Sequence, residues 1–184
     1  SNDDIADFPK FCSDFMACYV VSCKISAPYY VFTNEKEIET IREAFRANGL
    51  IPSQLLIWKK HRIGFGGADY QHTYEPFIYG YKEHKTRYFV NDRTLSDVWE
   101  FARPASSELH PTMKPIELIA HGLNKSSKSE DIILDLFLGS GSTLIACEQT
   151  NRSCYGMEID PKYIDVIRKR YAKFIGKEEE WEKI

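Results

Sequence analysis

The sequence predicts an α/β fold in which a mostly parallel sheet carries an antiparallel hairpin at one edge. Apolar, β-branched runs alternate with segments of helical spacing, which is typical of parallel sheets covered by helices. Residues 132–143 show this most clearly, because an apolar run ends in an acid, turns on two glycines and enters a helix. Two further runs, 54–59 and 76–81, follow each other without a helix between them and indicate the hairpin.

Length and composition predict one globular domain without a membrane span. The 184 residues are 43% hydrophobic and 28% charged, which is ordinary for a soluble protein. The net charge of -3 excludes a generally basic surface, so a nucleic-acid partner would need a local patch. Five cysteines without metal-type spacing predict reduced thiols, no zinc site and a cytoplasmic protein. No run is long enough to span a bilayer, and no signal peptide is visible.

The N-terminal part predicts two helices around one strand. Apolar residues at spacings of three and four predict an amphipathic helix over residues 5–23, with Pro9 in its first turns. The aromatic and β-branched segment 28–33 predicts a buried strand. Asn34 is a suitable N-cap for a following helix that closes at the Asn-Gly pair 48–49.

The middle of the chain predicts the hairpin and a long irregular region. The strands 54–59 and 76–81 are joined by a polar, glycine-rich loop over residues 59–74. Residues 82–109 are charged and irregular, and residues 97–101 predict one short strand within them.

The C-terminal part predicts helices and strands in alternation. Pro115 suits the first turn of a helix that extends to Asn124. After a polar connector come two strand–helix pairs, with predicted ranges 132–137, 142–150, 153–159 and 161–175. Residues 177–184 are predicted as a last helical or frayed segment.

The glycine turn predicts a site for a nucleotide-type cofactor. Gly139 and Gly141 allow positive φ angles and a close approach of a ligand, and the helix behind them directs N–H groups at the turn. Glu158 ends the next strand after Asp135, where a carboxylate can accept hydrogen bonds from a ribose diol. A solvated carboxylate at the end of a strand is the alternative interpretation of Glu158.

Leu144 argues against a nicotinamide dinucleotide. It occupies the position at which the dinucleotide-binding pattern has its third glycine. A smaller cofactor without a pyrophosphate therefore fits the turn better.

Residues 110–115, His-Pro-Thr-Met-Lys-Pro, form a second candidate site. Two prolines stiffen this segment, and Thr112 and Lys114 place a hydroxyl and an ammonium group near a helix start. Such a pair suits a carboxylate ligand. The alternative is an ordinary helix entry stabilised by proline.

Together, these segments and residues 156–160 (Gly-Met-Glu-Ile-Asp), with Tyr163 and Arg170, resemble the S-adenosylmethionine-dependent DNA amino-methyltransferases of the β-type. The resemblance implies a Rossmann-like methyltransferase sheet and S-adenosylmethionine as the cofactor. It implies a set of cofactor-binding residues: Thr112, Lys114, Asp135, Phe137, Gly139, Ser140, Gly141, Ser142, Thr143 and Glu158. In this family the glycine turn contacts the methionine part, and the acid at the position of Glu158 holds the ribose.

One motif of the family is absent from the 184 residues. The family's catalytic tetrapeptide is Asp/Asn/Ser-Pro-Pro-Tyr/Phe, and the nearest string, Ser-Ala-Pro-Tyr at 26–29, lacks the first proline. We therefore assign no catalytic residue to this chain. The resemblance implies that the catalytic strand lies upstream of Ser1 and, in the sheet, between the strands 132–137 and 28–33. We expect a fold that is incomplete at its N-terminus and a chain that is inactive alone; direct pairing of those two strands would contradict this.

DNA contacts are expected from local basic patches. Cations follow the first hairpin strand and recur after the second, where they interleave with aromatic residues suited to stacking. The candidate residues are Lys60, His61, Arg62, Lys85 and Arg87. A solvated hairpin surface is the alternative interpretation. The cations of the last predicted helix, Arg170 among them, are interpreted as a solvated helix face.

With the resemblance, the sequence predicts a single methyltransferase domain over residues 1–184. Its parts are the remainder of the catalytic half (1–81), a target-recognition insert (82–109) and the cofactor-binding half (110–184). The predicted reaction transfers a methyl group to an exocyclic amine of DNA, adenine N6 before cytosine N4, without a metal ion. A non-catalytic cofactor- or DNA-binding module and a dinucleotide-dependent oxidoreductase remain as rivals, and a homodimer remains open.

Overall fold

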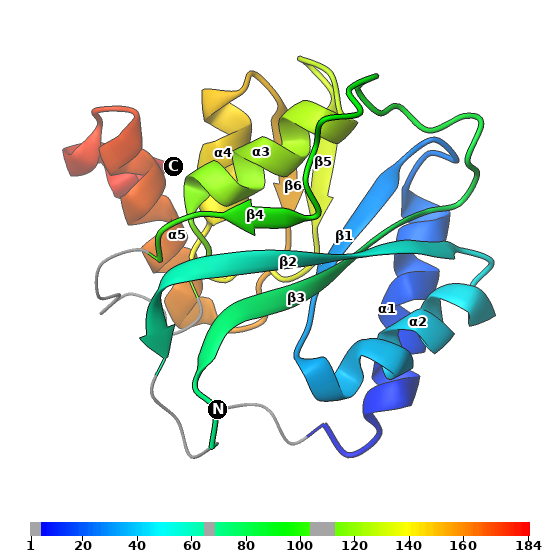
Figure 1. Cartoon of the computed structure of the whole chain (residues 1–184). Helices are drawn as coiled ribbons and strands as arrows, with labels where there is room; N and C mark the ends of the chain where they lie inside the picture. The colour runs from blue at the N-terminus through cyan, green and yellow to red at the C-terminus, as the bar shows by residue number, and fades with distance from the viewer. Residues whose placement is uncertain (1–4, 65–68, 104–112) are drawn as a thin grey trace. The chain divides into compact units, whose positions relative to one another are not determined.

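The computed structural model describes residues 5–64, 69–103 and 113–184. The chain divides into two compact units, 1–100 and 101–184, whose elements can be followed by colour in Figure 1. The expectation that both belong to one methyltransferase domain stays a prediction. Within the described residues, no helix combines the length and the apolar character needed to cross a membrane.

Two helices form one layer of the first unit. α1 (Phe8–Ser22) begins three residues later than predicted, because the Asp7 side chain caps it by accepting a hydrogen bond from the N–H of Lys10 at 3.0 Å. α2 (Ile38–Ala47) packs against α1.

Asn34 acts as the predicted N-cap before α2. Its side-chain oxygen accepts hydrogen bonds from the N–H groups of Lys36 at 3.0 Å and Glu37 at 3.2 Å. The first turn of the predicted helix is a 3₁₀ turn, η1 (Glu35–Glu37), and the α-helix starts only after it.

The sheet of the first unit has four strands in the order β1-β3-β2-β4. Their bounds are β1 (Pro28–Phe32), β2 (Ile51–Gly64), β3 (His72–Tyr81) and β4 (Val98–Glu100). β3 pairs antiparallel with β1 and with β2, whereas β4 pairs parallel with β2. Antiparallel pairing therefore has a larger share of this sheet than the sequence predicted.

The β2–β3 hairpin differs from its prediction in two ways. Its strands extend through most of the region 59–74 that was predicted as a loop, with register shifts in β2 that bend the strand. The hairpin also does not form the edge on the β2 side, because β4 pairs with β2 there and the Ile57 N–H donates to the carbonyl of Asp97 at 2.8 Å.

The two faces of this sheet have different packing. One face meets α1 and α2 in a core that contains Met16, Tyr29, Phe45 and Ile78. The other face carries aromatic rings from three strands, with Phe32 stacked on Phe77 at 4.5 Å between ring centroids. Further ring pairs on this face are Phe77–Trp99 at 5.0 Å and Tyr30–Tyr79 at 5.2 Å. Alternation along each strand separates the two sets.

The second unit alternates helices and strands. Its elements are α3 (Ile116–Ser126), β5 (Ile132–Asp135), α4 (Ser142–Gln149), β6 (Ser153–Gly156), α5 (Pro161–Phe174) and the 3₁₀ segment η2 (Glu178–Lys183). β5 and β6 pair in parallel, α4 packs on β6, and α3 lies beside α4 (Figure 1). Buried Leu118, Ile145, Ala146 and Ile167 form the apolar interior of this unit.

Within the described residues, each unit has its own sheet, of four strands in the first and two in the second. β1 pairs with β3, and β5 pairs with β6. The expectation of an additional strand between 28–33 and 132–137 stays a prediction.

Candidate functional site

The site is built around the turn between β5 and α4, which two glycines form. Gly139 has φ 55° and Gly141 has φ 82°, in the left-handed region that residues with a side chain rarely adopt. A Cβ atom at position 141 would lie 3.1 Å from Cγ2 of Ile167 on α5. Gly141 is thus required both by the turn and by the close packing of α5.

The turn holds its own backbone in place. Four of its N–H groups donate to protein acceptors: Phe137 to Asp135 Oδ1 at 2.9 Å, Leu138 to the carbonyl of Met157 at 2.9 Å, Gly139 to Glu158 Oε2 at 2.8 Å and Gly141 to the carbonyl of Leu138 at 2.9 Å. These donors are therefore already used by the protein. The turn differs in this respect from a phosphate-binding loop, in which backbone N–H groups point at the ligand.

Asp135 links the end of β5 to the start of α4. Its Oδ1 atom accepts from the N–H of Phe137, and its Oδ2 atom accepts from Thr143 Oγ1 at 2.6 Å. Thr143 is buried in the first turn of α4, so the carboxylate is fixed on both sides. Each carboxylate oxygen has a second lone pair that remains for a ligand.

Glu158 lies directly after β6 and faces the same turn. Oε2 accepts from the N–H of Gly139, and Oε1 accepts from the N–H of Asp160 at 2.9 Å. Asp160 in turn caps α5 by accepting from the N–H of Lys162 at 3.0 Å. Both oxygens of Glu158 are therefore bonded to the backbone, and its role in ligand binding stays a prediction.

Two serines connect the turn to other elements of the unit. Ser142 Oγ donates to the carbonyl of Lys114 at 2.8 Å, which joins the start of α4 to the segment before α3. Ser140, 4% exposed, is bonded to the guanidinium group of Arg170 on α5.

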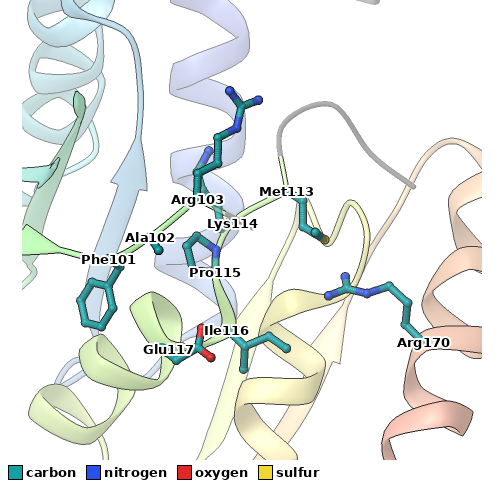
Figure 2. Close-up of a pocket in the computed structure, with 9 residues that line it drawn as sticks. All are labelled: Phe101, Ala102, Arg103, Met113, Lys114, Pro115, Ile116, Glu117 and Arg170. Atoms are coloured by element: carbon teal, nitrogen blue, oxygen red, sulfur yellow. The ribbon is translucent and has the colours of Figure 1, made fainter. Parts of the chain in front are cut away.

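A pocket of about 550 Å³ lies next to these two contacts. Figure 2 shows the guanidinium group of Arg170 reaching towards Met113 and Ile116, with Lys114 and Arg103 on the other side of the pocket. The lining combines basic side chains with the apolar Met113, Pro115 and Ile116, and contains one acid, Glu117.

Large apolar side chains are exposed near the carboxyl ends of β5 and β6. Phe137 is 53% exposed, Met157 63% and Ile159 90%. These residues follow the strands directly, so they flank the same turn as Asp135 and Glu158. Their exposed surface can contact a flat, apolar part of a ligand.

Of the predicted cofactor-binding residues, the turn brings eight together: Asp135, Phe137, Gly139, Ser140, Gly141, Ser142, Thr143 and Glu158. Lys114 meets them through its backbone carbonyl and lines the pocket. Thr112 lies outside the described residues. The ligand-binding roles of all ten stay predictions.

Arg170 was placed wrongly by the sequence analysis. It was grouped with the solvated cations of the last helix, but it is half-buried and bonded to Ser140. A signal was present in the sequence, because Arg170 follows the buried Ile167 by three positions and so shares its helix face.

The predicted DNA-contacting cations lie in the first unit, and two of them already have protein partners. Lys60 Nζ forms an ion pair with Glu75 Oε1 at 2.6 Å, and its side chain is only 12% exposed. Arg87 donates to the Tyr79 hydroxyl at 3.2 Å, and its guanidinium carbon lies 4.7 Å from the centre of the Tyr81 ring.

Of the other three predicted DNA-contacting residues, two are exposed and one has a side chain that the structure does not describe. His61 and Lys85 are exposed, and the side chain of Arg62 lies outside the described residues. DNA contact by all five residues stays a prediction. Among the described residues, no three His, Cys, Asp or Glu side chains gather as metal ligands would.

Comparison with protein families and curated proteins gives consistent matches. The model of the DNA methylase family matches residues 1–169. The Type II methyltransferase M2.MboI of Moraxella bovis is 24% identical over 185 residues, covering 92% of this chain and 68% of that protein. M.HpaI of Haemophilus parainfluenzae is 38% identical over 79 residues, but these cover only 41% of this chain and 25% of that protein.

Solved structures share the fold at low sequence identity. The M1.HpyAVI–SAM complex has a TM-score of 0.77 at 22% identity, covering 86% of this chain and 81% of that chain. The cytosine-N4-specific PvuII DNA methyltransferase has a TM-score of 0.76 at 12% identity, covering 98% of this chain and 78% of that chain. The predicted Rossmann-like α/β fold is thereby confirmed.

Proposed function

The chain belongs to the DNA methylase family, and on that premise we propose that it binds S-adenosylmethionine and serves methyl transfer to an exocyclic amine of DNA. When bound, the cofactor supplies a methyl group on a positively charged sulfonium. The residues of this chain bind and orient it. Their part in the transfer is positioning and electrostatics.

The observation that carries the proposal is the pair of carboxylates at the self-bonded glycine turn. Asp135 ends β5, Glu158 lies two residues after the end of the parallel strand β6, and both contact the turn. Two negative groups beside a turn whose N–H groups are already bonded disfavour a pyrophosphate, because like charges repel and donors are few. They suit a ligand that carries hydroxyl groups and positive charge, as S-adenosylmethionine does.

Different residues of the site would contact different parts of S-adenosylmethionine. Glu158 would accept from the ribose hydroxyls, and the exposed Phe137 and Ile159 offer apolar surface for the adenine ring. The turn at 139–141 would lie against the methionine part. Lys114 would meet its carboxylate at the pocket.

Adenine N6 is the first candidate for the acceptor and cytosine N4 the second. The second is kept because the PvuII neighbour, which shares the fold over 98% of this chain, is described as cytosine-N4-specific. Mass spectrometry of nucleosides from treated DNA would separate N6-methyladenine from N4-methylcytosine. Because no catalytic tetrapeptide occurs in these 184 residues, we assign no residue of this chain to the reacting amine.

The cofactor part of the proposal is tested by calorimetric titration of the chain with S-adenosylhomocysteine and, separately, with NAD. Saturable binding of S-adenosylhomocysteine without binding of NAD is expected. Replacing Glu158 by Ala should weaken that binding by about 1–3 kcal/mol, because ribose hydroxyls lose an acceptor. Glu179→Ala, which removes an exposed acid from η2, is the matched control and should leave the affinity unchanged. Binding of NAD alone would contradict the proposal.

The catalytic part needs a second measurement, which also addresses the rival non-catalytic module. We propose that the chain alone binds the cofactor but does not transfer the methyl group. Incorporation of labelled methyl groups into DNA should therefore stay at background with this chain, and should appear when a segment carrying the Pro-Pro-Tyr-type motif is supplied. Transfer by the chain alone would show that its own residues suffice. No transfer in either case would favour the binding module.

A further inference from the structure

Arg170 reaches the glycine turn from a helix thirty residues further along the chain. Its Nη1 atom donates to Ser140 Oγ at 2.8 Å and also to the Ser140 carbonyl oxygen. Ser140 stands between the two glycines of the turn and is buried. One nitrogen of the guanidinium group therefore makes both contacts with the turn.

The rest of the guanidinium group has no partner among the described residues. Nε and Nη2 carry three further N–H donors, and no carboxylate within the described ranges forms an ion pair with Arg170. Burial lowers the pKa of Arg170, as expected for a cation that has lost water without gaining a counter-ion. A half-buried charge in this state is stabilised by an anion.

The pocket beside Arg170 has the shape and charge for such an anion. Lys114 and Arg103 line the same pocket, so three cations border one space. Met113, Pro115 and Ile116 add apolar walls. Figure 2 shows Glu117, the one acid of the lining, separated from Arg170 by Ile116. A carboxylate on a short aliphatic chain matches this combination, because the cations bind the charge and the apolar walls contact the methylene groups.

We propose that Arg170 is a specificity-determining residue that binds the carboxylate at the amino-acid end of the methyl donor, together with Lys114. The guanidinium group then has two roles at once: Nη1 fixes Ser140 of the turn, and the remaining N–H groups bind the ligand. The inference rests on the proposed function, since it assigns one end of the same ligand to a residue of α5.

The test compares two ligands that differ by the carboxylate alone. Affinities for S-adenosylhomocysteine and for its decarboxylated form are measured by calorimetry with the unaltered chain and with the Arg170→Ala variant. The unaltered chain should prefer the carboxylated ligand by about tenfold or more. Arg170→Ala should lose most of this preference; loss of the Ser140 contact should weaken both ligands by the same factor, so the ratio of the two affinities is the readout.

The matched control is Lys173→Ala, which also removes one positive charge from α5 but at an exposed position. It should keep the preference of the unaltered chain. An equal loss of preference in Lys173→Ala would show that the general charge of the helix is responsible, and would overturn the assignment to Arg170.

The remaining outcomes separate the two proposals. If Arg170→Ala weakens both ligands by the same factor and keeps the preference, Arg170 only supports the turn, and the inference is wrong while the proposed function stands. If the unaltered chain binds neither ligand, the proposed function fails.

A second variant covers a loss of folding in Arg170→Ala, monitored by circular dichroism. Arg170→Lys keeps the charge but has a single nitrogen, so it cannot hold Ser140 and the ligand in the same way. Its preference for the carboxylated ligand should lie between that of the unaltered chain and that of Arg170→Ala. A preference equal to that of the unaltered chain would overturn the role given to the guanidinium fork.

Discussion

At the scale of single residues, Tyr29 shows that a buried polar group can have no partner in this fold. Its side chain is 5% exposed in the core between α1, α2 and β1, and among the described residues its hydroxyl has no hydrogen-bond partner. Burial raises the pKa of Tyr29 to about 12. The ring is needed for packing, as its edge-to-face contacts with Tyr19 and Phe45 show, but the hydroxyl contributes no bond.

We predict that Tyr29→Phe leaves the free energy of unfolding unchanged or raises it by up to about 1 kcal/mol, because a buried group without a partner is removed. Urea denaturation followed by fluorescence measures this. Tyr81→Phe is the control, since the Tyr81 hydroxyl accepts from Ser53 Oγ at 3.2 Å, and it should cost about 0.5–1.5 kcal/mol. A clear destabilisation by Tyr29→Phe would indicate a partner for its hydroxyl.

The two acids at the glycine turn were predicted from the sequence, but their contacts were not. Asp135 was predicted as a site residue from the family resemblance, and Glu158 because a carboxylate at the end of the next strand can accept hydrogen bonds from a ribose. Their bonds to the turn itself were not foreseen, since a hydrogen bond between Glu158 and Gly139 joins residues nineteen positions apart. Arg170 was missed for the same reason.

At the scale of elements, the hairpin strand β3 meets helix α2 at a glycine. A Cβ atom at Gly80 would lie 2.3 Å from Cε1 of Phe45, closer than van der Waals contact allows. Phe45 is fully buried in the core between the helices and the sheet. The absence of a side chain at position 80 therefore sets how closely α2 approaches the sheet.

We expect Gly80→Ala to lower the free energy of unfolding by about 1–3 kcal/mol, because either Phe45 or the backbone must move. Chemical denaturation gives the value. Gly49→Ala provides the comparison: no atom lies within 4 Å of its Cβ position, but its φ of +69° strains any side chain, so its cost has a purely backbone origin. In the Phe45→Leu background, Gly80→Ala should cost less than in the parent. Equal costs would exclude the Phe45 clash as the cause and point to the Ile51 carbonyl oxygen, 2.7 Å from the Cβ position.

At the scale of the whole molecule, acidification lowers the free energy of unfolding through groups that stay uncharged in the folded state. The pKa of His121 on α3 is lowered from its usual value of 6.5, first by burial and second by the positive charge of Lys125. Its ring packs edge-on against Phe101 at 5.6 Å. The unfolded chain therefore binds a proton at this residue at a higher pH than the folded chain does.

The sign follows from this difference. Above the unfolded pKa both states are neutral and His121 has no effect on stability; as the pH falls below about 6.5, the unfolded state gains a proton first and the stability decreases. We predict that His121→Phe, which keeps a ring beside Phe101, loses less stability between pH 7.5 and pH 5.5 than the parent. Urea denaturation at both values measures the difference. An equal loss in parent and variant would show that other groups cause the acid sensitivity.

The sequence by itself determined the order of the elements and the chemistry of the turn. Helical spacing, aromatic strands and the two glycines are local properties, and they predicted the positions of α1, β1, β5, α4 and α5 to within a few residues. The acids Asp135 and Glu158 stood out for the same local reason. The resemblance of these motifs to a known family then predicted the DNA methylase assignment, which the family model confirms.

Only the tertiary structure decided which distant residues meet. It extended β2 and β3 through a region predicted as loop, because pairing between strands stabilises residues whose local pattern is weak. It placed β4 beside β2, and it brought Arg170 to Ser140, so that a cation assigned to solvent borders the pocket. Hydrogen bonds and packing between residues far apart in the sequence depend on the folded backbone, and spacing along the chain does not encode them directly.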